Sequence, residues 1–155
     1  MPRVLIVAYG NPLRADDGVA CRAADQLLQS LPDSEIQCFH QLGPELAEAI
    51  THFERVIFLD AAFPTEGMKP GDIRIQPLLP NTNATDQSRF SHVVTPQTVV
   101  TLASSLYHVD VKADLITVTG QTFDHGDRLS DAVAAALPNL VAKVEQLART
   151  PITNS

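Results

Sequence analysis

Basic residues, cysteines and long apolar runs are all scarce in this sequence of 155 residues, and each scarcity excludes a class of protein. Only 11 Lys and Arg stand against 18 Asp and Glu, and no basic cluster occurs. Because phosphate backbones are held by grouped Lys and Arg, we expect no nucleic-acid binding. The apolar stretch near the N-terminus is too short for a membrane span or a signal peptide. We therefore expect a cytoplasmic protein without a membrane contact.

The spacing of the cysteines and the absence of several common catalytic motifs exclude further classes of protein. Cys21 and Cys38 are not in a Cys-x-x-Cys arrangement, and we interpret both as reduced core residues without a redox or metal role. The sequence has no His-Glu-x-x-His, no Gly-x-Ser-x-Gly, no P-loop and no Gly-x-Gly-x-x-Gly. Zincins, serine hydrolases, P-loop NTPases and a standard dinucleotide fold are thereby excluded, which leaves chemistry assisted by a metal or a carboxylate.

The first sixty residues alternate between strand and helix patterns. Short runs rich in β-branched and aromatic residues predict strands, and apolar residues at helical spacing predict helices. The expected elements are a strand at 4–9, a helix at 19–31, a strand at 35–39, a helix at 44–52 and a strand at 56–59. This alternation predicts an α/β fold: a doubly wound, mostly parallel five-stranded sheet flanked by helices on both faces, in a single three-layer domain.

The second half continues the pattern with less regularity. Residues 72–77 predict an edge or antiparallel strand, 78–92 a long polar loop, Thr95-Pro96 the start of a helix, and 115–119 a further strand. A helical pattern over 129–147 contains Pro138, so we expect a kink or two short helices there. We expect one domain over residues 1–148 and a C-terminal tail at 149–155.

Acidic residues follow two of the predicted strands. Asp16 and Asp17 lie between the first strand and the first helix, and Asp60 directly follows the strand at 56–59. Strands one and three of a doubly wound sheet usually lie side by side, so these carboxylates are expected to face one crevice. Helix capping is the alternative role for the Asp16-Asp17 pair, and a satisfied turn acid is the alternative for Asp60.

His92 is the third candidate, because it ends the long polar loop just before a helix. Two carboxylates and one imidazole form a set that leaves coordination positions open for water or substrate, and the set fits zinc, nickel or manganese. The alternative role is that of an ordinary surface-loop histidine. Asp124 and His125 are reserve ligands, because their loop follows the strand at 115–119 and could reach the same edge.

The chain resembles the hydrogenase maturation endopeptidase family. Residues 4–19, VLIVAYGNPLRADDGV, are similar to that family's opening signature of a strand, a Gly-Asn turn, a two-acid turn and a helix. Asp60 matches the family's second metal-binding acid, and Ser91-His92 matches its histidine. The similarity continues through 115–120 and the final helix, so it spans nearly the whole chain.

The resemblance implies a metal-dependent endopeptidase that removes the C-terminal extension of a [NiFe]-hydrogenase large-subunit precursor after nickel insertion. It implies that Asp17, Asp60 and His92 bind nickel, which is borne by the precursor or bound at the site, with zinc or cadmium as surrogates. Asp16 matches the acid beside the first ligand and joins the expected catalytic set. The partner is then the precursor, and we expect a monomer.

Two alternatives remain at this point. A non-catalytic nickel-binding or accessory module of hydrogenase assembly would use the same residues without cleaving anything. A methyltransferase or nucleotide-binding domain would need a glycine-rich first turn and an acid after the second strand, where this chain has His40-Gln41. The segment 40–46 also differs from the glycine-rich loop of many family members, so the resemblance does not specify which precursor is processed.

Overall fold

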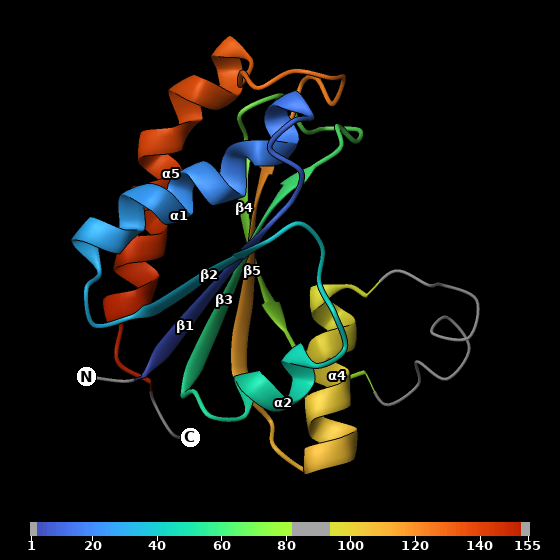
Figure 1. The fold of residues 1–155 in the computed structure, drawn as a ribbon, viewed down its shortest axis with the longest axis vertical. Helices are drawn as coiled ribbons and strands as arrows, with labels where there is room; N and C mark the ends of the chain where they lie inside the picture. Colours follow the sequence, from blue (N-terminus) through green and yellow to red (C-terminus); the bar gives the residue numbers. More distant parts are fainter. Residues whose placement is uncertain (1–2, 82–93, 153–155) are drawn as a thin grey trace.

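A computed structural model describes residues 3–81 and 94–152 of the chain. Strands and helices alternate along it, as the sequence predicts (Figure 1). The elements are β1 (Val4–Tyr9), the 3-10 helix η1 (Ala15–Gly18), α1 (Val19–Ser30), β2 (Glu35–Phe39), α2 (Leu46–Ile50), β3 (Arg55–Ala62), β4 (Ile73–Leu78), α4 (Pro96–Tyr107), β5 (Lys112–Thr119) and α5 (Asp131–Arg149).

The five strands form one sheet in the order β2-β1-β3-β5-β4. The pairs β1–β2, β1–β3 and β3–β5 are parallel, whereas β4 pairs antiparallel with β5 at the sheet edge. The predicted sheet is therefore confirmed, including the neighbouring positions of β1 and β3 and the antiparallel edge strand. The carboxyl ends of the parallel strands meet at one edge, which is where the predicted acids lie.

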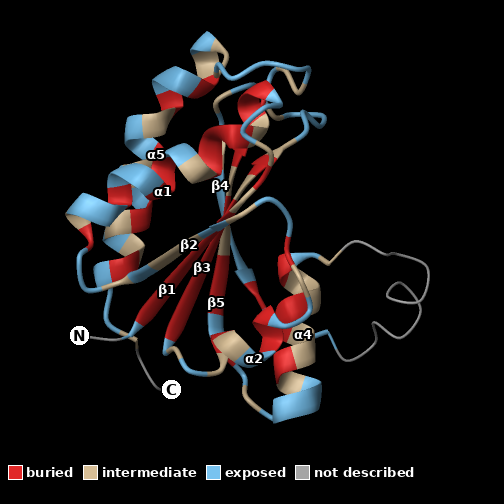
Figure 2. Cartoon of the chain, viewed as in Figure 1, coloured by how far each residue is buried: buried red, intermediate tan, exposed pale blue. Residues whose placement is uncertain are grey.

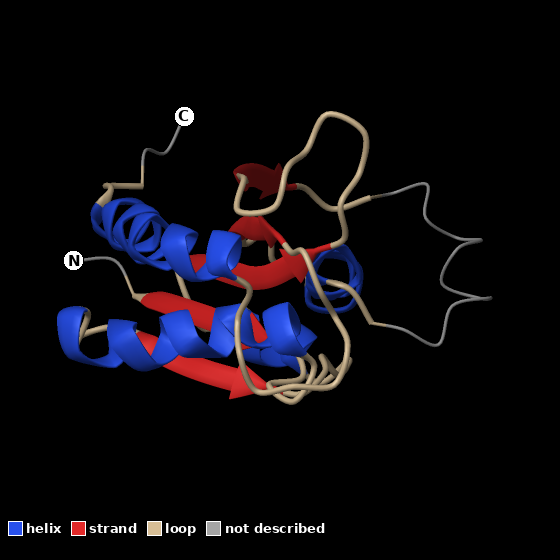
Figure 3. Ribbon diagram, turned by 90° about the horizontal axis from the view of Figure 1, so that it is seen from above, coloured by secondary structure: helices blue, strands red, loops and turns tan. Residues whose placement is uncertain are grey.

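Helices cover both faces of the sheet. One core lies under α1 and α5, and includes Ile6, Ile57 and Ile116 from the strands. The other core lies under α2 and α4, and includes Val7 and Phe58. Figure 2 shows β1 and β3 as largely buried ribbons between these layers, and Figure 3 shows the arrangement from above. Strands enclosed on both faces read as continuous apolar runs, which explains the sequences of β1 and β3.

Helix α5 crosses Pro138 as one continuous helix, so the prediction of two short helices is wrong. Proline removes one backbone hydrogen bond, that to the carbonyl of Ala134. Both residues lie on the exposed side of α5, so water can reach the freed carbonyl. Val133 and Leu140 on the opposite side are fully buried and hold the helix against the sheet. Packing therefore offsets the lost hydrogen bond.

The two cysteines form a disulfide, and the prediction that both are reduced core residues is wrong. Cys21 of α1 is bonded to Cys38 of the edge strand β2 across 17 residues. Neither side chain is fully buried. Cys21 does lie in an apolar helix as predicted, but on the side of that helix that faces β2. In the described parts of the chain, no helix is long and apolar enough to cross a membrane.

Candidate functional site

The turn after β1 brings Asp17 back against the end of that strand. Gly10 has φ of +143°, and a Cβ atom added there would lie 2.1 Å from the backbone oxygen of Asp17. Only glycine leaves room for this approach. The backbone N–H of Asn11 then donates to Asp17 Oδ2 at 2.8 Å. The Gly-Asn dipeptide therefore fixes both the backbone and the side chain of Asp17.

Asp60 lies beside the last residue of β1. The register pairs Ala8 with Leu59, so Tyr9 stands alongside Asp60. The Tyr9 hydroxyl donates to Asp60 Oδ2 at 2.7 Å. The sequence suggested that the strand ends just before Asp60, but β3 continues to Ala62. Asp60 lies instead where β1 stops, which leaves its side chain only partly buried.

The environment of Asp60 favours its protonated form. Burial raises the pKa of Asp60 to about 7, hydrogen bonds from Tyr9 and the Ala61 backbone act against this rise, and the charge of Asp17 adds to it. Burial and the charge of Asp60 raise the pKa of the Tyr9 hydroxyl, so Tyr9 stays protonated and acts as the donor. The effect of the Asp17 charge on Asp60 means that two carboxylates lie at one site, which a cation would stabilise.

Asp16 points away from this pair and into the protein. Its side chain is fully buried and accepts hydrogen bonds from the backbone of Gln121, Thr122 and Ser130 and from the Ser130 hydroxyl. Burial alone would raise the pKa of Asp16, but these hydrogen bonds outweigh it and lower the pKa. With both oxygens taken, Asp16 ties the loop between β5 and α5 to η1. The geometry favours this structural role over the catalytic one expected from sequence.

Helix capping does not account for the pair of acids either. The N-cap of α1 is Gly18, which has no side-chain cap, because η1 intervenes between the turn and the helix. Asp17 bonds back to Asn11, and Asp16 bonds across to the loop that follows β5. Asp17 therefore bonds within the turn that follows β1, Asp16 bonds to a distant loop, and neither carboxylate caps α1.

Exposed apolar side chains occur on the loops that follow β1 and β3. Leu13 is 64% exposed and Phe63 is 68% exposed. Phe63 packs on Phe123 with ring centroids 4.4 Å apart, and Arg14 Nε donates to the Phe123 carbonyl at 3.1 Å. These residues belong to the loops after β1, β3 and β5. Together they place exposed apolar surface next to Asp17 and Asp60.

His92, the third predicted ligand, lies outside the described residues. The helix that follows it begins as predicted: the Thr95 side chain caps α4 by accepting from the Thr98 backbone at 3.1 Å. Helix α4 lies on the same face of the sheet as the second core, to which Tyr9 and Val94 both contribute. Within residues 3–81 and 94–152, no group of three His, Cys, Asp or Glu side chains could hold a metal ion.

The reserve ligands Asp124 and His125 and the histidines His52 and His108 belong to no metal-binding group among the described residues. Asp124 and His125 are exposed in the loop after β5, whose Gly126 bonds to the backbone of Leu13 and Ala15. Their loop thus reaches the carboxyl edge, as expected. His52 follows α2, and His108 is the C-cap of α4.

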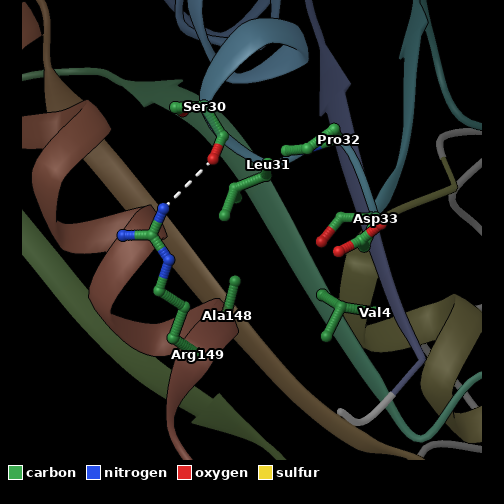
Figure 4. A pocket seen from close by; sticks show the side chains of 8 residues that line it. Val4, Ser30, Leu31, Pro32, Asp33, Ala148 and Arg149 are labelled. Atoms are coloured by element: carbon green, nitrogen blue, oxygen red, sulfur yellow. Dashed lines mark hydrogen bonds between the residues drawn. The ribbon is translucent and has the colours of Figure 1, made fainter.

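A pocket at the opposite edge of the sheet is not part of this site. It has a volume of about 130 Å³ and is lined by Val4 at the start of β1, by the segment 30–34 and by the end of α5. Figure 4 shows Arg149 directed at the Ser30 carbonyl, to which it donates at 3.1 Å. Its charged lining groups, Asp33 and Arg149, offer none of the convergent acids found at the carboxyl edge.

Tyr9 and Ser130 are the two residues of this region that sequence reasoning missed. Tyr9 is the last residue of the strand predicted at 4–9, and its phenol carries a polar group to the sheet edge beside the Gly-Asn turn. Ser130 was part of a helical pattern, although serine before an apolar helix commonly caps it, as it does here. Their contacts with Asp60 and Asp16 depend on tertiary packing.

Comparison with solved structures defines the class of the fold. A hydrogenase 2 maturation peptidase from a Thaumarchaeota archaeon is 26% identical, with 95% of this chain and 98% of that chain covered and a TM-score of 0.70. HybD of E. coli, a hydrogenase maturating endopeptidase, is 20% identical over 95% and 92% of the two chains, with a TM-score of 0.71. HycI of Thermococcus kodakarensis, a [NiFe] hydrogenase maturation protease, is 19% identical over 96% and 93%, with a TM-score of 0.71.

The chain is thus a single α/β domain with an acidic carboxyl edge, built on the fold of these maturation proteases. The resemblance to the hydrogenase maturation endopeptidases is confirmed along nearly the full length. No protein-family model matches the sequence, and no curated protein matches it at a significant level.

Proposed function

We propose that this protein is an endopeptidase that removes the C-terminal extension of a nickel-loaded [NiFe]-hydrogenase large-subunit precursor in the cytoplasm. The observation that carries the proposal is the pairing of Asp17 and Asp60 at the carboxyl edge of a sheet shared with hydrogenase maturation proteases. Burial and the charge of Asp17 disfavour the ionised form of Asp60, and a cation beside the two carboxylates would offset this effect. The nickel of the precursor supplies that cation as part of the substrate.

In this proposal Asp17, Asp60 and His92 contact the nickel. Asp17 is fixed by the Asn11 backbone and Asp60 by Tyr9, so both carboxylates are oriented before substrate arrives. Helix α4, which begins shortly after His92, lies on the face of the sheet to which Tyr9 and Asp60 also belong. A precursor without nickel would leave the two carboxylates uncompensated, and premature cleavage would thereby be avoided.

The surroundings of the acids suit a peptide substrate. In this proposal the peptide packs against Leu13 and Phe63, which are exposed on the loops after β1 and β3. Two backbone hydrogen bonds join the loop that carries Leu13 to the loop after β5, between Leu13 and Gly126 at 2.9 Å and between Ala15 and Gly126 at 2.7 Å, and Phe123 of that second loop packs on Phe63. The substrate surface is therefore supported by the same loops that position the acids.

The test is cleavage of a cognate nickel-loaded precursor, followed by gel mobility, with wild-type protein, Asp17→Ala and Asp25→Ala. Asp25 is an exposed acid on α1 and serves as a matched control. We expect a shorter product with wild type and Asp25→Ala and none with Asp17→Ala. Full activity of Asp17→Ala would contradict the site, and binding of nickel without cleavage by wild type would instead support a non-catalytic accessory module.

A further inference from the structure

The contact between Tyr9 and Asp60 joins the neighbouring strands β1 and β3 at the acidic edge. The Tyr9 ring is partly buried, packs against the core under α2 and α4, and stands opposite Phe39 in the pairing of β1 with β2. Its hydroxyl lies 2.7 Å from Asp60 Oδ2. A side chain held by strand pairing and by packing keeps its hydroxyl in place without a further loss of entropy.

This contact limits what Asp60 can offer to a substrate. A carboxylate has two oxygens and can bind a cation through one or both of them. Tyr9 occupies Oδ2, and the backbone of Ala61 also hydrogen-bonds to the Asp60 carboxylate. The contact therefore restrains the rotation of the carboxylate, and the Tyr9 hydroxyl engages only one of its two oxygens.

We propose that Tyr9 is a positioning residue, whose hydroxyl holds Asp60 so that its second oxygen faces the substrate-borne nickel as a single donor. The inference rests on the proposed function, because it concerns the same substrate. Tyr9 touches neither the nickel nor the scissile bond. It acts on the reaction only through the orientation of Asp60, as hydrogen-bonding partners of metal ligands commonly do.

The chain provides a matched pair of substitutions, because it contains only two tyrosines. Tyr9→Phe removes the hydroxyl and leaves the packed ring in place. Tyr107→Phe removes the same atom at the end of α4, where the residue is 44% exposed and far along the chain from Asp60. Tyr107→Phe therefore measures any general effect of removing a phenolic hydroxyl.

The first arm of the test is steady-state cleavage of the nickel-loaded precursor. Loss of a partner to a metal ligand typically weakens binding roughly 10- to 100-fold. We expect Tyr9→Phe to raise KM by at least about 10-fold and to leave kcat within about threefold, because an interaction with bound nickel is lost before and during the reaction alike. The thermal midpoint should stay close to that of Tyr107→Phe. A KM equal to that of wild type overturns the inference. A higher KM together with a large fall in the thermal midpoint relative to Tyr107→Phe also overturns it.

The second arm needs no cleavage. Calorimetric titration with Cd²⁺ as the probe compares wild type, Tyr9→Phe and Tyr107→Phe, and we expect only Tyr9→Phe to bind roughly 10-fold or more weakly. Equal Cd²⁺ affinities together with equal KM values reject the role of Tyr9 and leave the endopeptidase intact. If wild type neither cleaves the precursor nor binds Cd²⁺, the proposed function and the inference fail together.

Discussion

The adjacent acids Asp16 and Asp17 have different partners although they are neighbours in the chain. Asp17 turns toward the end of β1, where Asn11 and Asp60 lie. Asp16 turns into the protein and accepts four hydrogen bonds from the loop that precedes α5. The 3-10 geometry of η1 directs successive side chains to different sides. The Asp17 carboxylate thereby lies at the site, whereas the Asp16 carboxylate connects η1 to the loop that precedes α5.

Replacing Asp16 should therefore affect stability first. Asp16→Ala leaves the backbone donors of Gln121, Thr122 and Ser130 without their acceptor in a buried region, which costs about 3 kcal/mol of unfolding free energy. Urea denaturation of Asp16→Ala beside Asp25→Ala measures the difference. An Asp16→Ala protein as stable as the control but inactive would restore the catalytic role expected from sequence.

Gly10 is the second residue with a sharp requirement. Alanine there would place its Cβ 2.1 Å from the Asp17 carbonyl oxygen, so Gly10→Ala must displace the turn and should cost roughly 3 kcal/mol. Gly67 has φ of +84° but no atom within 4 Å of an added Cβ, so Gly67→Ala should cost only about 1 kcal/mol. Equal urea midpoints for the two variants would show that the contact with Asp17 does not constrain the turn.

At the scale of elements, the regular helices and strands were predictable and the contacts between them were not. The run from Val19 to Leu31 repeats at helical spacing and gives α1, and the apolar segment 4–9 gives β1. Helix α5 differs from expectation at Pro138, because burial of its inner side is a tertiary effect. The acidic edge shows the same limit: Gly10, Asp17 and Asp60 carry a local signal, whereas the Tyr9–Asp60 contact depends on the register of β1 and β3.

The Cys21–Cys38 disulfide is likewise a contact between elements, and it links α1 to the edge strand β2. A cross-link that closes a loop of 17 residues stabilises a protein by about 3 kcal/mol in the chain-entropy model. Thermal unfolding should therefore occur at a lower temperature with reductant than without it. The double variant Cys21→Ala/Cys38→Ala is the control and should not respond to reductant. An unchanged wild-type midpoint would show that the bond contributes nothing to stability.

The disulfide also bears on the cellular setting. Thiols are usually kept reduced in the cytoplasm, where we place the reaction. Cys21 is partly buried and Cys38 exposed, so reductants can reach the bond. We expect the reduced protein to retain its cleavage activity, because neither cysteine lies at the carboxyl edge with Asp17 and Asp60.

For the whole molecule, the buried carboxyls make stability depend on pH. Asp60 has a folded pKa of about 7, above its unfolded value, so the folded state keeps a proton that the unfolded state loses. The raised pKa of Asp60 therefore lowers the free energy of unfolding as pH rises from about 4 to about 7. Asp16 acts oppositely: its lowered pKa gives stability above the unfolded value, which is lost in more acidic solution. Burial also raises the pKa of Asp114, which adds to the effect of Asp60.

Comparison of Asp60→Asn with wild type isolates the first effect. Between pH 4 and pH 8 the free energy of unfolding of wild type should fall relative to the variant, by about 2 kcal/mol after allowance for solvent screening. Urea unfolding at several pH values measures it. A difference between the two proteins that stays constant with pH would contradict the raised pKa of Asp60.

We propose that cleavage at the edge formed by Asp17 and Asp60 requires nickel in the precursor. The most direct measurement is intact-mass spectrometry of the precursor after incubation with wild-type protein, with nickel-loaded and nickel-free precursor in parallel. We expect loss of a C-terminal peptide from the nickel-loaded precursor and an unchanged mass for the nickel-free one. Equal shortening of both precursors, or of neither, would contradict it.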